Sequence, residues 1–351
     1  MTRQMRLAIV TPFYFPSVRG NSITVQRIES GLRDQGLMVR VWSLEHGPSP
    51  AEILRALEEF TPDLVHGFHA TASGRPVVDT ARRLGIPSIL TVTGTDVNND
   101  LFDPERRPQV IDVLKQATRI VVFHDVMRAK IIGELPEVEN RIRVIGQTVR
   151  CQEVPFDFRG RLGFAPDDLI FFIPSGIRRV KNVTFCLKPL EALRGRYPQI
   201  KAVFMGPVIE PEEGVRLQGA LKNRPWAFYL GPVTHEEMCA MLKSVDVVIN
   251  SSRSEGGMAN SVLEAMSRGR AVLVSDIEGN RTVVRDGIDG LLFDSEAEFS
   301  EKAGRLIREP QLRQELGRKA EEKIEREFSR EGEIQDYLQL YEEAVADESR
   351  R

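Results

Sequence analysis

The sequence predicts an α/β protein built from two doubly wound domains that face a cleft. With 351 residues, the chain exceeds the size that one hydrophobic core usually serves. Short apolar runs alternate with longer amphipathic runs, and the alternation restarts after an irregular stretch at 149–168. Apolar strands that alternate with helices form parallel sheets, so we expect one such sheet in each half.

The first half contains six apolar runs of strand length. Between them, segments such as "SITVQRIESGLRDQG" and "PQVIDVLKQA" place apolar residues three and four apart, which is typical of helices. The predicted strands are 6–11, 38–43, 63–66, 88–93, 119–123 and 141–146.

The second half repeats this pattern and ends in a charged helical segment. That segment carries Ile334, Leu338, Tyr341 and Val345 on one helical face. We therefore predict domains at 1–155 and 156–328, and a C-terminal helix at 329–351 that is free to pack back on the first domain. The predicted strands of the second half are 169–174, 201–206, 227–231, 246–251, 271–276 and 290–293.

The composition is that of a soluble globular protein, with 41% hydrophobic and 28% charged residues and a net charge of −3. This charge gives no basis for a nucleic-acid partner. Cys151, Cys186 and Cys239 fit neither a disulfide framework nor a zinc site, so we predict free thiols. No apolar run is long enough for a signal peptide or a transmembrane segment. We expect a cytoplasmic protein, and the oligomeric state stays open.

Two predicted strand-to-helix turns carry residues suited to anions. In "TPFYFPSVRGNSIT", Gly20 and Asn21 precede a helix, where they serve either an anion site or a simple helix cap. In "IPSGIRRVKNV", Gly176 permits a tight turn, and Arg178 and Lys181 lie three residues apart. Two cations beside a helix start would neutralise a diphosphate, although a solvated basic turn is an equal alternative.

A third turn, "SEGGMANSVLEAM", places two glutamates around a glycine pair. The residues from Ser261 to Glu264 fit a capping box, in which Glu264 would accept a hydrogen bond at the start of a helix. That interpretation leaves Glu255 unexplained, at the end of a predicted strand. Because ligands bind beyond the carboxyl ends of parallel strands, we regard this turn as a candidate site.

These motifs resemble those of the family 4 retaining glycosyltransferases, which have the GT-B fold of two Rossmann-like domains. The resemblance covers 250–293, "GIRRVKN" and the N-terminal "TPFYFPSVRGNSIT", and therefore nearly the whole chain. Among relatives, the glycosyltransferase-1-domain-containing proteins look most similar, through "GIRRVK", "GTDVN" and "VVINSSRSEG".

The resemblance implies a role for each matched residue. Glu264 would accept hydrogen bonds from both ribose hydroxyls of a nucleotide, and Glu255 would hold hydroxyls of the transferred sugar. Arg178 and Lys181 would neutralise the leaving diphosphate. The family usually has seven residues between the two glutamates, whereas this chain has eight, which affects the sugar side of the site. The implied donor-binding residues are Gly20, Asn21, Gly176, Arg178, Lys181, Gly257, Met258, Ala259, Asn260 and Glu264.

Two further strand ends in the first half carry polar residues. "DLVHGFHATASG" contains His69, which the resemblance places near the sugar or diphosphate, and His66, its second choice. Either histidine could instead be a structural hydrogen-bonding residue. "TVTGTDVNND" contains Thr95 and Asp96, where many relatives have a histidine. Asp96 could orient the acceptor or cap the following turn.

The sequence thus predicts metal-independent glycosyl transfer from a nucleotide sugar to a small-molecule or glycan acceptor. It contains no Asp-x-Asp for a metal-bound diphosphate, and no P-loop or Gly-x-Gly-x-x-Gly. The expected donor is a UDP-sugar, with GDP- or ADP-sugars as alternatives and no cofactor. The predicted catalytic residues are Arg178, Lys181, Glu255 and His69. Rival functions on this scaffold are a phosphorylase, a nucleotide-sugar epimerase or a seleno- or thiosugar synthase. A rival of another class is a nucleotide-sugar binding protein without turnover.

Overall fold

The computed structural model describes residues 4–16, 20–149, 151–152 and 154–350. The chain divides into two compact units. The first unit comprises Met1–Thr148 and Ser329–Arg351, and the second comprises Val149–Phe328. The predicted boundary after residue 155 lies inside the second unit, whereas the predicted start of the final segment at 329 coincides with a unit boundary.

Each unit contains a parallel six-stranded sheet among its described residues. All twelve predicted strands are present, with ends that differ from the predictions by at most two residues. The first unit contains β1 (Arg6–Thr11), β2 (Met38–Ser43), β3 (Leu64–Phe68), β4 (Ser88–Thr91), β5 (Arg119–Val122) and β6 (Ile142–Val144). The second contains β7 (Leu169–Pro174), β8 (Ile200–Met205), β9 (Ala227–Tyr229), β10 (Val247–Asn250), β11 (Ala271–Ser275) and β12 (Leu291–Phe293).

The strand orders of the two sheets differ. The first sheet has the order β2-β1-β3-β4-β5-β6, and the second has the order β12-β11-β10-β7-β8-β9. Both are doubly wound orders, in which the direction of winding reverses once. The reversal lies between β1 and β3 in the first sheet and between β7 and β10 in the second. Ligands of such sheets bind at this point, beyond the carboxyl ends of the strands.

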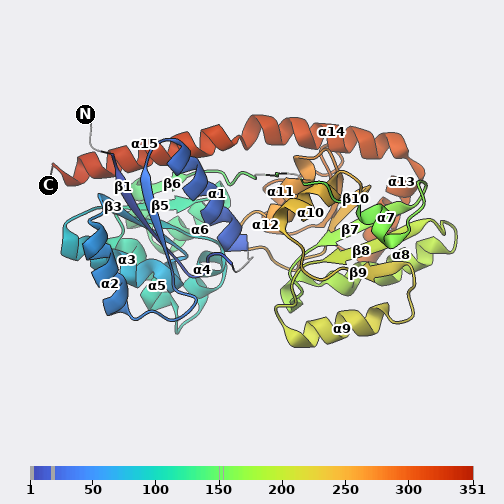
Figure 1. The fold of residues 1–351 in the computed structure, drawn as a ribbon, viewed down its shortest axis with the longest axis horizontal. Coiled ribbons are helices and arrows are strands. Elements are labelled where there is room, and N and C mark those ends of the chain that lie inside the picture. The colour runs from blue at the N-terminus through green and yellow to red at the C-terminus, as the bar shows by residue number, and fades with distance from the viewer. Residues whose placement is uncertain (1–3, 17–19, 150, 153, 351) are drawn as a thin grey trace. The chain divides into compact units, whose positions relative to one another are not determined.

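Helices cover both faces of the first sheet (Figure 1). Helices α1 (Gly20–Asp34) and α15 (Arg330–Glu348) pack on one face, and α2 (Pro50–Phe60), α3 (Ala70–Leu84), α5 (Arg107–Gln116) and α6 (Asp125–Glu134) pack on the other. Because helices cover both faces, the interior strands β1, β3, β4 and β5 are almost entirely buried, whereas the edge strands β2 and β6 carry exposed residues. The unit also contains α4 (Thr95–Asn98) and the 3-10 helices η1 (Asp100–Phe102) and η2 (Pro136–Arg141).

The second sheet is covered in the same way. One face packs against α8 (Leu187–Arg194), α9 (Pro211–Leu221) and α13 (Glu296–Arg308), and the other against α7 (Phe158–Leu162), α10 (His235–Leu242) and α11 (Asn260–Met266). Helix α14 (Pro310–Glu327) contributes to both cores. The unit also contains α12 (Glu278–Arg281) and the 3-10 helices η3 (Arg179–Lys181) and η4 (Val183–Cys186).

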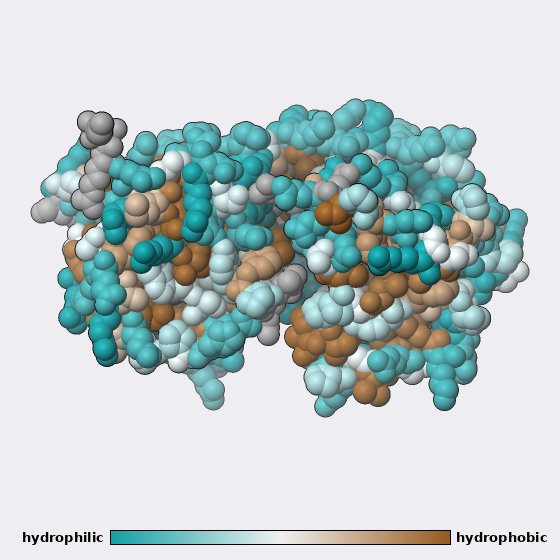
Figure 2. All heavy atoms as spheres, in the orientation of Figure 1, coloured by the Kyte–Doolittle hydropathy of each residue, from teal (hydrophilic) through white to brown (hydrophobic). Residues whose placement is uncertain are grey.

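The final helix, α15, belongs to the first unit although it ends the chain. Tyr337 and Tyr341 are fully buried in the core that α15 shares with α1, β1 and β3. Two hydrogen bonds of 2.9 and 2.7 Å join the buried guanidinium of Arg27 to the carboxylate of Glu333. Thr148 also donates to Glu333 at 2.8 Å, so this carboxylate is paired and hydrogen-bonded in the core. The visible side of α15 is largely hydrophilic (Figure 2), which completes an amphipathic helix.

The prediction of three free thiols is wrong. Cys151 and Cys239 form a disulfide between residues 88 positions apart, and Cys186 is a buried free thiol. A disulfide requires Cα atoms within about 4.4–6.8 Å, a proximity that sequence spacing does not reveal. These two Cα atoms are 5.4 Å apart. Disulfides are rare in reducing compartments, so cytoplasmic localisation stays a prediction without support from this pair. No helix in the described part of the chain is long and apolar enough to cross a bilayer.

Candidate active site

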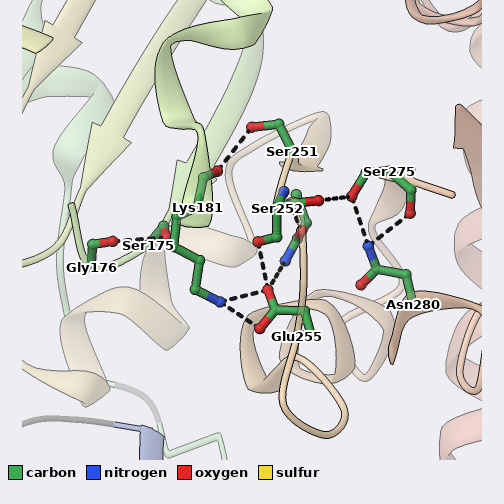
Figure 3. Close-up of polar contacts among 9 residues, drawn as sticks. Ser175, Gly176, Lys181, Ser251, Ser252, Glu255, Ser275 and Asn280 are labelled. Carbon is green, nitrogen blue, oxygen red and sulfur yellow. Dashed lines mark hydrogen bonds and ion pairs between the residues drawn. The ribbon is translucent and has the colours of Figure 1, made fainter. Parts of the chain in front are cut away.

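A buried ion pair lies where the second sheet reverses its winding (Figure 3). Lys181 ends the turn that follows β7, and Glu255 lies in the loop that follows the neighbouring strand β10. The Lys181 Nζ atom lies 2.5 Å from Oε1 and 2.6 Å from Oε2 of Glu255. Only 15% of the Lys181 side chain and 8% of the Glu255 side chain are exposed. The predicted cation and the predicted sugar-binding carboxylate therefore contact each other.

Three side chains hold the Glu255 carboxylate in its ionised form. Asn250 Nδ2 donates to Oε1 at 3.0 Å, and Ser252 Oγ donates to the same oxygen at 2.6 Å. Burial alone would raise the pKa of Glu255, but the Lys181 ammonium and these hydrogen bonds outweigh burial and hold the pKa below its usual value. Oε2 accepts only from Lys181 among the described residues, so it retains acceptor capacity.

A hydrogen-bonded frame fixes the loop that carries Glu255. The Asn250 Oδ1 atom accepts from the backbone N–H of Ser252 at 3.0 Å, and Ser275 Oγ donates to the carbonyl of Ser252 at 2.6 Å (Figure 3). Helix α12 also packs closely on this loop. A Cβ atom at Gly279 would lie 2.5 Å from the carbonyl oxygen of Gly257, so only glycine permits this approach.

The turn after β7 also carries Arg178 and Gly176. Arg178 precedes η3, and its Nε atom is buried without a hydrogen-bond partner among the described residues. Gly176 packs against Ile209, whose Cδ1 atom would lie 2.6 Å from a Cβ at this position. The structure thus places both basic residues on one short turn, but it joins only Lys181 to Glu255.

The second predicted carboxylate, Glu264, is buried on α11 and has a partner that the sequence analysis missed. Its Oε1 atom lies 2.7 Å from Nε2 of His235, the first residue of α10. The predicted capping box is wrong, because α11 begins at Asn260 with Ala259 as its N-cap and without a side-chain cap. Glu264 therefore lies beyond the first turn, where its carboxylate reaches α10 instead of the helix start.

The remaining predicted donor residues lie between these two carboxylates in the chain or at the first helix. Gly257 is buried, Met258 packs against the core below the loop, and Ala259 is 5% exposed. Asn260 begins α11 and is half-buried. In the first unit, Gly20 begins α1 and is exposed.

Asn21 lies at the reversal point of the first sheet. Its Nδ2 atom donates to Oγ1 of Thr11, the last residue of β1, at 2.7 Å. The side chain therefore joins the start of α1 to the end of β1. This contact is compatible with both alternatives for the turn, a ligand site and a structural link.

The structure places His66 in the core of the first unit. Its ring is fully buried, with Nδ1 2.8 Å from the hydroxyl of Tyr341 and Nε2 2.7 Å from that of Thr91. Burial lowers its pKa to about 3, so the ring is neutral. Both ring nitrogens have protein partners, which favours the structural alternative for this residue over contact with an acceptor.

His69 and Thr95 form a partly exposed pair at the same end of the sheet. His69 caps α3 by accepting from the N–H of Ala72 at Nδ1, and its Nε2 atom lies 2.8 Å from Oγ1 of Thr95. In the neutral ring, Nε2 therefore carries the hydrogen and donates to Thr95. The φ angle of His69 is 74°, an uncommon value for a residue other than glycine.

Asp96 is fully buried and accepts hydrogen bonds from four backbone N–H groups. The donors lie in the first turns of α3 and α4 and in the loop before α4; they belong to Ala70, Thr93, Gly94 and Val97. This arrangement favours capping of the turn, one of the two alternatives, over contact with an acceptor.

Comparison with known proteins identifies both units. Residues 18–147 match the family model described as a glycosyl transferase 4-like domain, and residues 156–323 match that of the glycosyl transferases group 1. The chain contains both of these glycosyltransferase domains. A relative, glycosyltransferase 1 domain-containing protein 1 of Xenopus tropicalis, is 26% identical over 92% of this chain and 93% of its own length. A D-inositol 3-phosphate glycosyltransferase of Frankia alni is 27% identical over 76% of this chain and 71% of its length.

Solved structures show the same fold at low sequence identity. HepE of Anabaena in complex with UDP-glucose matches with a TM-score of 0.82 and 14% identity, over 97% of this chain and all of that chain. Sucrose-phosphate synthase of Thermosynechococcus elongatus matches with a TM-score of 0.84 and 17% identity, over 98% of this chain and all of that chain. This chain therefore has the predicted two-domain, Rossmann-like GT-B fold.

Three polar residues of the second unit were not among the predicted site residues. Asn250 is the last residue of β10 and Ser252 lies two residues beyond it, so the rule that ligands bind at strand ends could have indicated both. His235 follows Thr234 in a capping box, a pattern that predicts a helix start but not a partner for the imidazole. Within the described residues, no group of three or more His, Cys, Asp or Glu side chains could hold a metal ion. Metal independence itself stays a prediction.

Proposed function

We propose that this glycosyltransferase moves a sugar from a UDP-sugar to a small-molecule or glycan acceptor, with retention of configuration and without a metal ion. The Lys181–Glu255 pair at the reversal point of the second sheet is the observation that supports this proposal most directly. The UDP-glucose complex of the structurally similar HepE supports UDP, in preference to GDP or ADP, as the nucleotide part of the donor.

In this proposal, Glu255 contacts the sugar and Lys181 contacts the diphosphate, the two groups joined by the bond that breaks. Glu255 Oε2 accepts a hydrogen bond from a hydroxyl of the transferred sugar. Lys181 has three N–H donors and directs at most two to Glu255, so one remains for an oxygen of the diphosphate. The ion pair thus holds the ammonium beside the leaving group before the donor binds.

Catalysis in this proposal is mainly electrostatic. Breaking the glycosyl-phosphate bond places negative charge on the diphosphate and positive charge on the sugar ring. Lys181, Arg178 and the backbone N–H groups of Gly257, Met258 and Ala259 stabilise the diphosphate charge, which lowers the barrier because these groups are already oriented. A fixed ammonium in a buried site does this better than a solvated one.

Retention follows if the acceptor attacks from the face that the diphosphate leaves. A phosphate oxygen of the donor then takes the proton of the acceptor hydroxyl. His69, which is partly exposed, is the proposed contact on the first unit for the sugar or diphosphate, and its Nε2 hydrogen, which Thr95 accepts in this structure, is the donor that would turn to the ligand. The ribose is held by Glu264, whose Oε2 atom has no partner among the described residues.

Calorimetric titration tests the donor site. The wild type is expected to bind UDP more tightly than GDP or ADP, and Glu264→Ala should weaken UDP binding by about tenfold or more, because each hydrogen bond to a charged group contributes about 1.5–3 kcal/mol. Glu322→Ala removes an exposed glutamate of α14 and is the matched control. Failure of the wild type to bind any of the three nucleotides at high micromolar concentration would refute the donor site.

Product analysis tests the reaction. Incubation with UDP-glucose and other UDP-sugars, with and without inorganic phosphate and with a chelator present, separates transfer from the rival reactions. Transfer releases UDP and is unchanged by the chelator, a phosphorylase requires phosphate, and an epimerase yields a new UDP-sugar. Tight donor binding without any donor consumption, across a panel of glycan, thiol and inositol acceptors, would support the binding protein instead.

A further inference from the structure

His235 and Glu264 form a pair that the proposed reaction does not yet use. The imidazole Nε2 atom and carboxylate Oε1 atom are 2.7 Å apart, and the two side chains are 20% and 5% exposed. A carboxylate can only accept a hydrogen bond, so His235 Nε2 carries the hydrogen and donates it. This bond occupies Oε1 on one side and leaves Oε2 for another donor.

The position of His235 is fixed by its helix and not by Glu264 alone. Thr234 and Glu237 form a capping box at the start of α10, which sets the first turn that His235 occupies. One turn later, the disulfide joins Cys239 to Cys151, and the Cys239 Sγ atom lies 4.0 Å from His235 Nε2. The capping box and the disulfide thus anchor α10 on both sides of the imidazole.

The two helices also share a core. Met238 and Leu242 of α10 are buried with Val262 and Leu263 of α11 in one hydrophobic cluster. Helix packing therefore sets the distance between the helices, and a His235–Glu264 bond is not needed to hold them together. A buried glutamate side chain keeps several rotatable bonds, however, and the imidazole restricts them by fixing one carboxylate oxygen.

We propose that His235 is a positioning residue that orients the Glu264 carboxylate toward the ribose hydroxyls of the nucleotide. This inference depends on the proposed role of Glu264 in donor binding. A vicinal diol donates two hydrogen bonds to one carboxylate only when the plane of that carboxylate is correctly oriented. A fixed Oε1 supplies this orientation before the nucleotide arrives, which reduces the ordering cost of binding.

The test compares UDP with 2′,3′-dideoxy-UDP by calorimetric titration, because only UDP offers the diol. The wild type is expected to prefer UDP by at least about tenfold, since the hydrogen bonds are made to a charged group. His235→Ala should reduce this preference by about threefold or more, whereas His235→Gln should retain it within about twofold, because its amide N–H replaces Nε2–H. The preference is a ratio within one variant, so it does not depend on how much of the sample is folded.

Two controls make the result decisive. His46→Ala removes an exposed histidine of the first unit and should leave the preference unchanged. In the Glu264→Ala background, His235→Ala should have no further effect on the preference, because the positioned group is absent. In steady-state assays, His235→Ala should raise KM for the UDP-sugar and leave kcat within about twofold.

The two proposals fail in distinguishable ways. If wild type and Glu264→Ala bind the two nucleotides with the same preference, Glu264 does not bind the diol, and both the ribose assignment and the inference fail. If Glu264→Ala loses the preference while His235→Ala retains it, the ribose assignment stands and His235 is only a structural link between α10 and α11. An equal loss of affinity for both nucleotides in His235→Ala would likewise refute positioning.

Discussion

Both units carry polar residues within the strands of their parallel sheets or in the segments that follow them, but these residues have different partners. In the first unit, His66 and Asp96 direct their hydrogen bonds at core hydroxyls and backbone N–H groups. In the second unit, Lys181 pairs with Glu255 and retains a donor. A strand end therefore locates a candidate site, whereas the hydrogen-bonding capacity left on each polar atom decides whether that atom can contact a ligand.

The largest effect on turnover is expected from the removal of Lys181, which tests whether the second unit supplies the main catalytic group. Lys181→Ala is expected to reduce the rate of UDP release from the UDP-sugar by about 100-fold to 1,000-fold, as removal of an oriented electrostatic group does in other enzymes. Affinity for UMP, which lacks the diphosphate, should change far less. The variant Lys188→Ala, which removes an exposed lysine of α8, is the control and should keep its rate within about twofold.

Stability must be separated from chemistry in this variant. Lys181→Ala leaves Glu255 buried without its cation, which destabilises the fold. The double variant Lys181→Ala/Glu255→Gln removes that unpaired charge and should regain thermal stability without regaining turnover. Wild-type turnover in either variant would contradict the catalytic role of Lys181.

The disulfide provides a second difference between the units, because it joins two residues of the second unit and should stabilise that unit. The double variant Cys151→Ser/Cys239→Ser should lower the free energy of unfolding by about 2 kcal/mol or more, since the bridge closes a long loop. Hydrogen exchange should become faster in α10, while β1 to β6 keep their protection. Titration of the denatured, unreduced wild type should give one thiol, that of Cys186; three thiols would show that the bridge does not form.

The buried His66 of the first unit should make the free energy of unfolding depend on pH. Burial lowers the folded pKa of His66 to about 3, whereas the unfolded value is about 6.5. Between these values the unfolded chain binds more protons, so acid destabilises the fold by up to about 1.4 kcal/mol per pH unit. This destabilisation is absent above about pH 6.5 and grows as the pH falls toward 3.

The measurement is the free energy of unfolding between pH 7 and pH 4. His66→Gln should show a shallower decline than the wild type, with UDP affinity unchanged within about twofold at neutral pH. His46→Gln, at an exposed site, should follow the wild type. A His66 variant with the wild-type slope would contradict the burial of a neutral ring, and one with lost UDP affinity would place His66 in the site.

The smallest expected effect concerns the partly exposed pair of the first unit. Thr95→Val removes the acceptor of the His69 hydrogen bond but keeps the shape of the side chain. One hydrogen bond between neutral groups contributes about 0.5–1.5 kcal/mol, so we expect a loss of folding stability of no more than about that amount and a change in turnover of about threefold. A loss of about 100-fold would mean that the first unit contributes as much to catalysis as the second, and would overturn the comparison.

Local patterns predicted the fold because each strand and helix is specified by nearby residues. The run "LIFFIP" has no polar position, as expected for β7 with helices on both faces, and the face of Ile334 and Tyr341 predicted α15. The same local rules located Glu255 and Lys181 at strand ends. They failed for Glu264, because the sequence does not show whether Ser261 caps the helix or lies inside a helix that begins at Asn260.

By itself, the sequence determined the two parallel sheets, the positions of the strands to within about two residues and the residue types near their carboxyl ends, because hydrophobic periodicity and turn residues act over a few positions. Only the tertiary structure decided which polar atoms meet. His235 and Glu264 are 29 positions apart, Lys181 and Glu255 are 74 apart, and His66 and Tyr341 are 275 apart. Hydrogen bonds and ion pairs act only at contact distance, and it is the packing of the sheets and helices that brings such groups together.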